Sequence, residues 1–316
     1  MIAVLGKVAG VFIMVLIGYG ANKIGWLPVE SSKFLSKIVI NIAAPCVVIH
    51  AMSQQELNMG SINTMLIVLG CIFSSYIFSW IFSIFICWLL KVPDDDKGIY
   101  KNFLIFTNNA FMGFPIAHAL FGNEGMFLMV VGNLLMPVFT YTLGSANLNP
   151  RKNKSISKFK VFKEQIKEVI NAPVIATLVG LVIFVMQIPI PVLLTDVLSS
   201  VGAMMAPLCM IVIGIQLTES KPSEVITNKK LIVICFLRLI FLPAIAFLAT
   251  YFLPIDRLVV CIITLTILLP CAAVPVALAE EYGKNVRLAA EGTFLSTLFS
   301  MITIPILGVL LTVYVL

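Results

Sequence analysis

Charged residues are scarce in this 316-residue chain, at 11%, while 60% of the residues are hydrophobic and the mean hydropathy is +1.07. A soluble domain has about 25% charged and about 45–50% apolar residues, so this composition excludes an ordinary soluble fold. One helical crossing of a bilayer needs about 20 apolar residues. The sequence therefore predicts an all-α polytopic membrane protein with no room for a separate soluble domain.

Cysteine and histidine are also few. The 7 cysteines are scattered through apolar segments without a Cys-x-x-Cys pair, which is typical of cysteine used as a small hydrophobe. A His-Glu-x-x-His pattern is absent, and Asp196 and Asp256 lie at the ends of apolar segments, so neither a zinc nor an aspartyl intramembrane enzyme is predicted. We expect no disulfide framework, no metal site, no cofactor and no enzymatic activity.

Ten apolar segments can be counted, at 2–22, 33–52, 62–90, 100–121, 124–144, 170–187, 194–217, 230–252, 256–279 and 287–315. Nearly all of the 21 Lys and Arg residues follow odd-numbered segments, and the largest group, from Arg151 to Lys167, follows the fifth. Because basic connections stay in the cytoplasm, we expect both termini outside. The 145–169 stretch is predicted to be a basic cytoplasmic loop near anionic lipid, and no nucleic-acid partner is expected.

An offset of about 160 residues relates the two halves of the chain. It aligns Ala44-Pro45 with Ala206-Pro207, and Pro115-Ile116-Ala117 with Pro275-Val276-Ala277. Five segments are an odd number, so the two halves must insert with opposite orientation. Inverted repeats of this kind are typical of secondary transporters. We predict a first repeat at 1–144, the loop at 145–169 and a second repeat at 170–316.

The fourth and ninth segments are interrupted at Asn108–Pro115 and at Pro270–Pro275. Proline removes a backbone donor, and broken backbone in a membrane is tolerated only where protein buries it or it lines a cavity. We expect Pro115 and Pro275 to be the first residues of second half-helices. The two helix N-termini would then approach one point from opposite sides, which favours an anion such as a carboxylate.

The candidate substrate-binding residues are those of the two breaks, together with one asparagine beside Pro45: Asn108, Asn109, Gly113, Pro115, Pro270, Cys271, Pro275 and Asn41. The asparagine pair could instead join helices by hydrogen bonds. Candidates for coupling or gating are His50, His118 and Glu281, of which the histidines could be structural and the glutamate an anchor at a cytoplasmic end. Arg238, Glu280 and Glu291 are weaker coupling candidates, and Thr293, Ser296 and Thr297 are expected to serve helix packing.

Two motifs carry a resemblance: Asn108…Gly113-Phe114-Pro115, and Leu269-Pro270…Val274-Pro275…Glu281-Tyr282. On these the chain resembles the auxin efflux carrier family, which includes plant PIN-type carriers and bacterial permeases proposed for malate and malonate. The short central loop and the Gly-Lys-Asn turn after Tyr282 resemble the bacterial branch, which implies a bacterial plasma membrane location. Asn109 stands where Thr is frequent and Cys271 where plant members carry Gln, and both departures put auxin itself in doubt.

The resemblance implies a bile-acid-symporter-like or PIN-like fold in which broken helices 4 and 9 cross. Helices 1, 2, 6 and 7 would form a scaffold that makes a homodimer, and helices 3–5 and 8–10 a transport domain that moves like an elevator. The predicted function is secondary active or facilitated transport of a small organic anion, such as malate, malonate or an auxin-like acid, bound at the crossover and coupled to H⁺ rather than Na⁺. Two alternatives remain open: a sodium-coupled symporter of the bile-acid type, although no Asp or Glu lies in either break, and a non-transporting sensor of organic acids.

Overall fold

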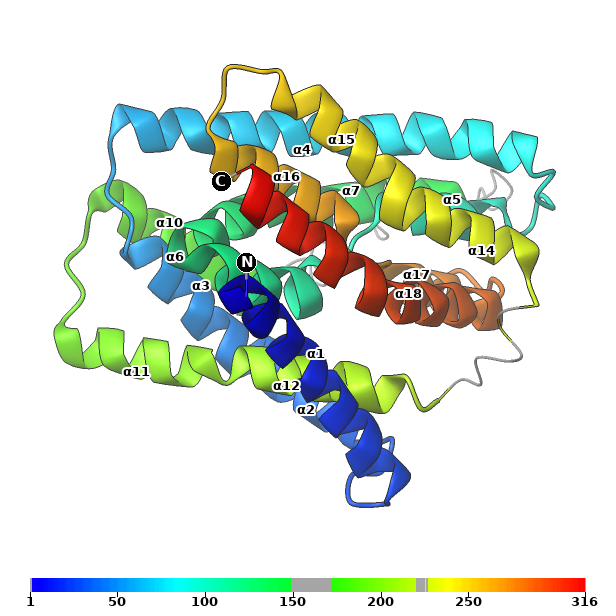
Figure 1. Cartoon of the computed structure of the whole chain (residues 1–316), viewed down its shortest axis with the longest axis horizontal. Coiled ribbons are helices and arrows are strands. Elements are labelled where there is room, and N and C mark those ends of the chain that lie inside the picture. The colour runs from blue at the N-terminus through cyan, green and yellow to red at the C-terminus, as the bar shows by residue number, and fades with distance from the viewer. Residues whose placement is uncertain (1, 149–171, 220–224, 226, 316) are drawn as a thin grey trace, which may run out of the picture.

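The computed structural model describes residues 2–148, 172–219, 225 and 227–315, most of which are helical (Figure 1). Within these residues no β-strand occurs, apart from one isolated two-residue bridge. Six helical runs are long and apolar enough to cross a membrane: 31–53, 59–89, 109–148, 192–216, 229–251 and 286–313. Many large apolar side chains on the outer helices are exposed, as lipid contact requires. The prediction of a helical polytopic membrane protein is confirmed.

The first half of the chain consists of α1 (Ile2–Lys23), α2 (Ser31–Ile38), η1 (Val39–Ala43), α3 (Ala44–Ser53), α4 (Met59–Leu89), α5 (Lys97–Ile105), η2 (Asn109–Gly113), α6 (Phe114–Asn133), α7 (Leu135–Phe139), η3 (Thr140–Gly144) and α8 (Ser145–Leu148). The η elements are single π-helical turns. Helical structure thus continues through α8, four residues beyond the predicted end of the fifth segment at 144. The remainder of the predicted basic loop, 149–169, lies outside the described residues.

The second half consists of α10 (Ala172–Met186), α11 (Val192–Ala203), α12 (Met205–Gln216), α14 (Lys229–Phe236), η4 (Leu237–Phe241), α15 (Leu242–Tyr251), α16 (Arg257–Leu268), α17 (Val274–Glu281) and α18 (Val286–Tyr314). Hydrophobic residues alone do not mark where these helices begin. Polar N-cap residues mark these positions in both halves of the chain. In the first half, the Asn58 side chain accepts from the Ser61 N–H at 2.8 Å at the start of α4. In the second half, the Asp256 side chain accepts from the Leu258 N–H at 2.6 Å at the start of α16.

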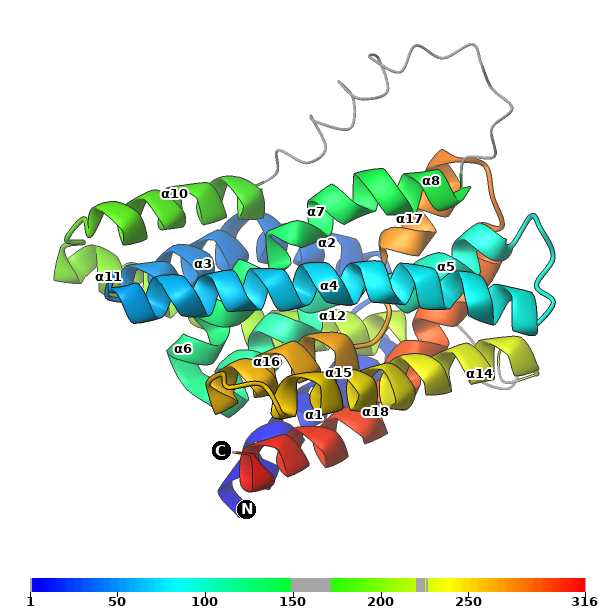
Figure 2. The same ribbon diagram turned by 90° about the horizontal axis from the view of Figure 1, so that it is seen from above.

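The helices lie in two neighbouring groups (Figures 1 and 2). In one group α1 packs along α12, and α3 packs against α10 and α11. In the other, α4 packs against α5 and α6, while α15 packs against α16. The contact of α1 with α12 is very close: a Cβ on Gly214 would stand 2.6 Å from the backbone nitrogen of Tyr19. Between the groups, α6 contacts both α3 and α12.

Helix α6 is bent at Gly122, whose φ is +67°. Glycine adopts this backbone conformation without the steric cost that a Cβ imposes. The bend lies between the fourth and fifth apolar segments of the sequence, so one helix label covers the end of one and the start of the other. Asn123 follows directly after it.

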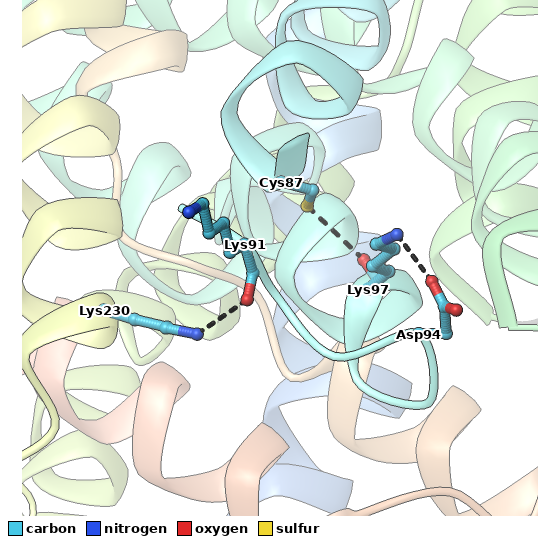
Figure 3. Close-up of polar contacts among 5 residues, drawn as sticks. All are labelled: Cys87, Lys91, Asp94, Lys97 and Lys230. Atoms are coloured by element: carbon cyan, nitrogen blue, oxygen red, sulfur yellow. Dashed lines mark hydrogen bonds and ion pairs between the residues drawn. The ribbon is translucent and has the colours of Figure 1, made fainter. Parts of the chain in front are cut away.

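The turn between α4 and α5 positions the first broken helix (Figure 3). Lys97 Nζ lies 2.5 Å from Asp94 Oδ1 and holds the pKa of that carboxyl below its usual range by hydrogen bonding and charge. Both side chains are exposed, so this pair adds little stability. Lys230 Nζ, at the start of α14, donates to the Lys91 carbonyl at 2.9 Å. That contact joins α14 to the turn from which α5 begins.

Candidate functional site

The two breaks lie against each other. α5 ends at Ile105 and α16 at Leu268, and the unwound residues after them pair through an antiparallel bridge between Thr107 and Cys271. The Asn108 N–H donates to the Pro270 carbonyl at 2.9 Å, and the Ala272 N–H donates to the Phe106 carbonyl at 3.2 Å. Each break therefore satisfies backbone groups of the other, which is what non-helical backbone needs where water is excluded.

Asn108 begins the second part of the first broken helix. Its Oδ1 accepts from the Phe111 N–H at 3.3 Å, as an N-cap does, and the π-turn η2 then leads directly into α6. The expectation that Pro115 starts this half-helix is wrong, because the helix begins six residues earlier, at Asn109. The wider π-turn allows Pro115, which lacks an N–H, to follow within a continuous helix. Pro275 is the second residue of α17, close to the predicted first position.

Asn109 has a different environment from its neighbour. It is fully buried, its Oδ1 accepts from the Thr107 hydroxyl at 2.7 Å, and its Nδ2 donates to Asn133 Oδ1 at 3.1 Å. The second bond joins the start of the π-turn to the end of α6. Asn109 therefore fixes the shape of the crossover, while the half-buried Asn108 lies at its edge.

Small residues allow the two chains to cross closely. A Cβ on Gly113 would come within 2.7 Å of the Leu269 side chain, so the close crossing requires glycine at this position. On the other side, the Cys271 N–H donates to Ser296 Oγ at 3.1 Å. The Thr293 hydroxyl donates to the Ala272 carbonyl at 3.4 Å. These two hydroxyl residues of α18, which we expected only to pack, hold the second break in place.

Arg238 also belongs to the crossover. It lies in η4 with 2% of its surface exposed, and its Nη1 donates to the Leu104 carbonyl at 2.8 Å. Its Nε donates to the Leu269 carbonyl at 3.3 Å. In the sequence, Arg238 is recognisable as a charged residue inside an apolar segment. Its backbone partners are 134 and 31 residues away, so the sequence could not identify them.

A cavity of about 420 Å³ lies beside the crossover, between α3, α6, α11 and α12. Its lining joins both helix groups: Val47, His50, Ala51, Phe114, Pro115, His118, Asn123, Met126, Leu198, Ser199, Gly202, Ala203, Met205 and Ala206. The structure thus brings His50 and His118, which come from α3 and α6, into one cavity. No Asp or Glu is among the lining residues.

Two of the polar residues that line this cavity are histidines. His118 Nε2 lies 3.1 Å from Asn123 Oδ1, an acceptor that orients the imidazole N–H. The buried Nδ1 of His50 has no hydrogen-bond partner among the described residues. A volume of this size fits a small molecule, and the lining offers imidazole, amide and hydroxyl groups to it.

The remaining predicted residues are elsewhere. Asn41 is exposed and donates to the Lys37 carbonyl of its own helix at 2.9 Å. Glu281 is exposed at the last position of α17. Neither lines the cavity, whereas Pro115 does. Asn108, Asn109 and Gly113 form the first break, just before the cavity-lining start of α6. Pro270 and Cys271 form the second break, and Pro275 is the second residue of α17, which follows it.

Comparisons with known proteins agree on the class of this chain. A family model described as membrane transport protein matches residues 3–307. The chain is 24% identical over 308 residues to an uncharacterized transporter of Methanothermobacter thermautotrophicus, which covers 96% of this chain and 97% of the relative. It is 25% identical over 304 residues to an uncharacterized transporter of Methanocaldococcus jannaschii, which covers 94% and 96%.

Proposed function

Because the chain belongs to the membrane transport protein family, that of the auxin efflux carriers, we propose that it carries a small organic anion across the membrane. The cavity between α3, α6, α11 and α12 is the proposed substrate site. The observation that carries this proposal is its lining, which contains two imidazoles, an amide and a hydroxyl but no carboxylate. A site of this composition offers hydrogen-bond donors to a carboxylate and holds no carboxylate of its own that would repel it.

The helix that leaves the first break also favours anion binding at this cavity. Helix η2–α6 begins at Asn109, after the N-cap Asn108, and runs to Pro115 and His118 in the cavity wall, so the positive end of its dipole lies on the crossover side. We therefore place the carboxylate near the first turns of this helix, between crossover and cavity. A malate- or malonate-sized acid suits both the volume and the polarity of the lining.

The cavity lies where the two helix groups meet, which favours an alternating-access mechanism. In this proposal the group built on α4–α6 and α14–α18 moves like an elevator against the group built on α1–α3 and α10–α12. The close glycine contact of α1 with α12 lies inside one group, so it would persist during the movement. Ten crossings in two inverted repeats, and a homodimer formed by the α1–α3 group, remain part of this proposal.

Coupling to protons suits the cavity better than coupling to sodium. No Asp or Glu is among the described residues that line the cavity, so a sodium ion there would have no carboxylate ligand. His50 and His118 are the titratable groups in the lining. Imidazole changes its charge near neutral pH, so protonation of this pair can accompany anion binding.

Uptake by purified protein in liposomes tests the proposal. Labelled malate, malonate and indole-3-acetate would be supplied with a proton gradient, a sodium gradient or neither. We expect saturable uptake of at least one acid, stimulated by the proton gradient. Asn108→Ala and His118→Ala should each reduce it at least tenfold, while Asn63→Ala, on an exposed position of α4, should leave it unchanged.

Other outcomes point to other functions. Stimulation by sodium alone would favour a sodium-coupled symporter. Specific binding of an acid by folded protein without flux would favour a sensor, and flux without saturation or counterflow would favour a channel. Absence of both binding and flux for all three acids would reject the proposed substrate class.

A further inference from the structure

Arg238 is the only buried residue with a charged side chain in the described part of the molecule. A guanidinium stays protonated in proteins, so a full positive charge lies inside the apolar core. Its two bonded carbonyls, of Leu104 and Leu269, belong to the last turn of α5 and to the C-cap residue of α16. These are the negative ends of two helix dipoles, which explains how the core accommodates the charge.

Within the part of the chain that the structure describes, no acid neutralises Arg238. The buried residues of the described chain include no Asp or Glu. The ionisable groups that face Arg238 are the phenol of Tyr76, from α4, and the thiol of Cys271, in the second break. Both are ordinarily uncharged at neutral pH. Helix dipoles stabilise the guanidinium but do not remove its net charge.

The guanidinium of Arg238 is bonded to the backbone directly before the second break. Leu269, which accepts from Arg238, precedes Pro270, whose carbonyl accepts from the Asn108 N–H. The narrow void beside the guanidinium, bordered by Cys271 and Ser296, has no room for a water molecule. A charge that water does not screen acts over a longer distance than a surface charge does. Its field therefore extends through the crossover toward the cavity.

We propose that Arg238 is a specificity-determining residue that makes the crossover positive and so selects anions, although it does not touch the substrate. This inference rests on the proposed function. It differs from a purely structural role, in which Arg238 would only join the ends of α5 and α16. A structural role predicts loss of folded protein, whereas a charge that selects anions predicts weaker substrate affinity in protein that is still folded.

Three variants separate the two roles. Arg238→Gln removes the charge, and Arg238→Lys keeps it with a different geometry. Arg257→Gln removes an exposed arginine at the start of α16, which donates to the Tyr251 carbonyl. Labelled malonate uptake, or uptake of whichever acid the wild type carries, gives KM and kcat per folded carrier. We expect Arg238→Gln to raise KM at least tenfold with a smaller change in kcat. Arg238→Lys should stay within threefold of the wild-type KM, and Arg257→Gln should match wild type.

An unchanged KM in folded Arg238→Gln would overturn the inference, as would a KM for Arg238→Lys that rises as far as that of Arg238→Gln. If Arg238→Gln does not fold, Arg238→Lys decides: a KM within threefold of wild type supports the inference, and a tenfold rise rejects it. Equilibrium binding of the same labelled acid, measured in detergent, separates the two proposals. If the wild-type protein neither binds nor carries any of the acids, both the proposed function and the inference are rejected. If the wild-type protein carries the acid normally and Arg238→Gln has the same KM, only the inference is rejected.

Discussion

At the scale of the residue, two adjacent asparagines do different work. Asn108 caps a helix and is half-buried at the edge of the crossover, whereas Asn109 is buried and has bonds to Thr107 and Asn133. The sequence could place both at the break, because amide residues beside proline in an apolar segment are unusual. It could not divide their roles, since Asn133 is 24 residues further along the chain.

The bond from Asn109 to Asn133 leads to a prediction about stability. Asn133→Ala would leave the buried Nδ2 of Asn109 without its acceptor, which costs about 1–3 kcal/mol. We expect a lower free energy of unfolding, by about that amount, in thermal or denaturant unfolding of the purified protein. Asn63→Ala, on an exposed position of α4, is the matched control and should change stability by less than about 0.5 kcal/mol. Equal stability of the two variants would show that the Asn109 amide finds another partner.

At the scale of the element, prolines coincide with π-turns. η1, η2 and η4 are each followed by a helix whose second residue is proline, at Pro45, Pro115 and Pro243. A proline within a helix leaves the carbonyl four residues earlier without its donor and crowds it. A π-turn widens the helix at that point. Because it holds one residue more than an α-helical turn, it rotates the side chains before it onto a different face of the helix.

This relation explains which part of the crossover could not be predicted. Proline is common at the first position of a helix, so the sequence indicated a start at Pro115. The alternative, a continuous helix that accommodates proline through a π-turn, has no sequence signal that distinguishes it. Pro275 has no π-turn before it, and there the predicted start was nearly right.

Pro115→Ala tests the π-turn directly. Alanine restores the N–H, so the carbonyl of Phe111 can regain a helical bond and the turn can tighten, which rotates Asn109 away from Thr107 and Asn133. We expect uptake to fall at least tenfold and the free energy of unfolding to fall by no more than about 3 kcal/mol, because the regained backbone bond offsets part of what the buried Asn109 side chain loses. Uptake and thermal unfolding are measured on the same preparation.

Pro305→Ala is the control for that experiment, because Pro305 lies inside α18 and no π-turn adjoins it. Removing a proline from a helix interior gains up to about 3 kcal/mol. This variant should be more stable than wild type and should transport normally. Normal uptake by Pro115→Ala as well would mean that the π-turn has no part in transport.

At the scale of the whole molecule, composition and the long apolar segments predicted a helical membrane protein, because a membrane requires apolar helices with internally bonded backbones. The cavity was not predictable in the same way. Its lining combines α3, α6, α11 and α12, and which faces of apolar helices meet depends on packing of small residues rather than on a hydrophobic stripe. His50 and His118 were candidates from their chemistry alone, and only the fold brings them together.

Several connections between helices lie at one of two opposite ends of the molecule (Figure 1). The α3–α4 and α10–α11 connections are at one end, and the α4–α5 and α17–α18 connections are at the other. Basic residues concentrate at the second end, with Lys91 and Lys97 around the α4–α5 turn and Lys284 before α18. The positive-inside rule predicts that this end faces the cytoplasm and that both termini face the outside.

Cysteine labelling in intact cells tests this orientation. Glu56→Cys, in the exposed α3–α4 connection, and Asp95→Cys, in the exposed α4–α5 turn, would be made separately in a chain whose half-buried Cys46 and Cys71 are serine. A membrane-impermeant maleimide should label the first in intact cells and the second only after permeabilisation. The reverse pattern would place the basic connections outside, contrary to the rule. Labelling of both positions in intact cells would mean that residues 59–89 do not cross the membrane, although they are apolar over a length that spans it.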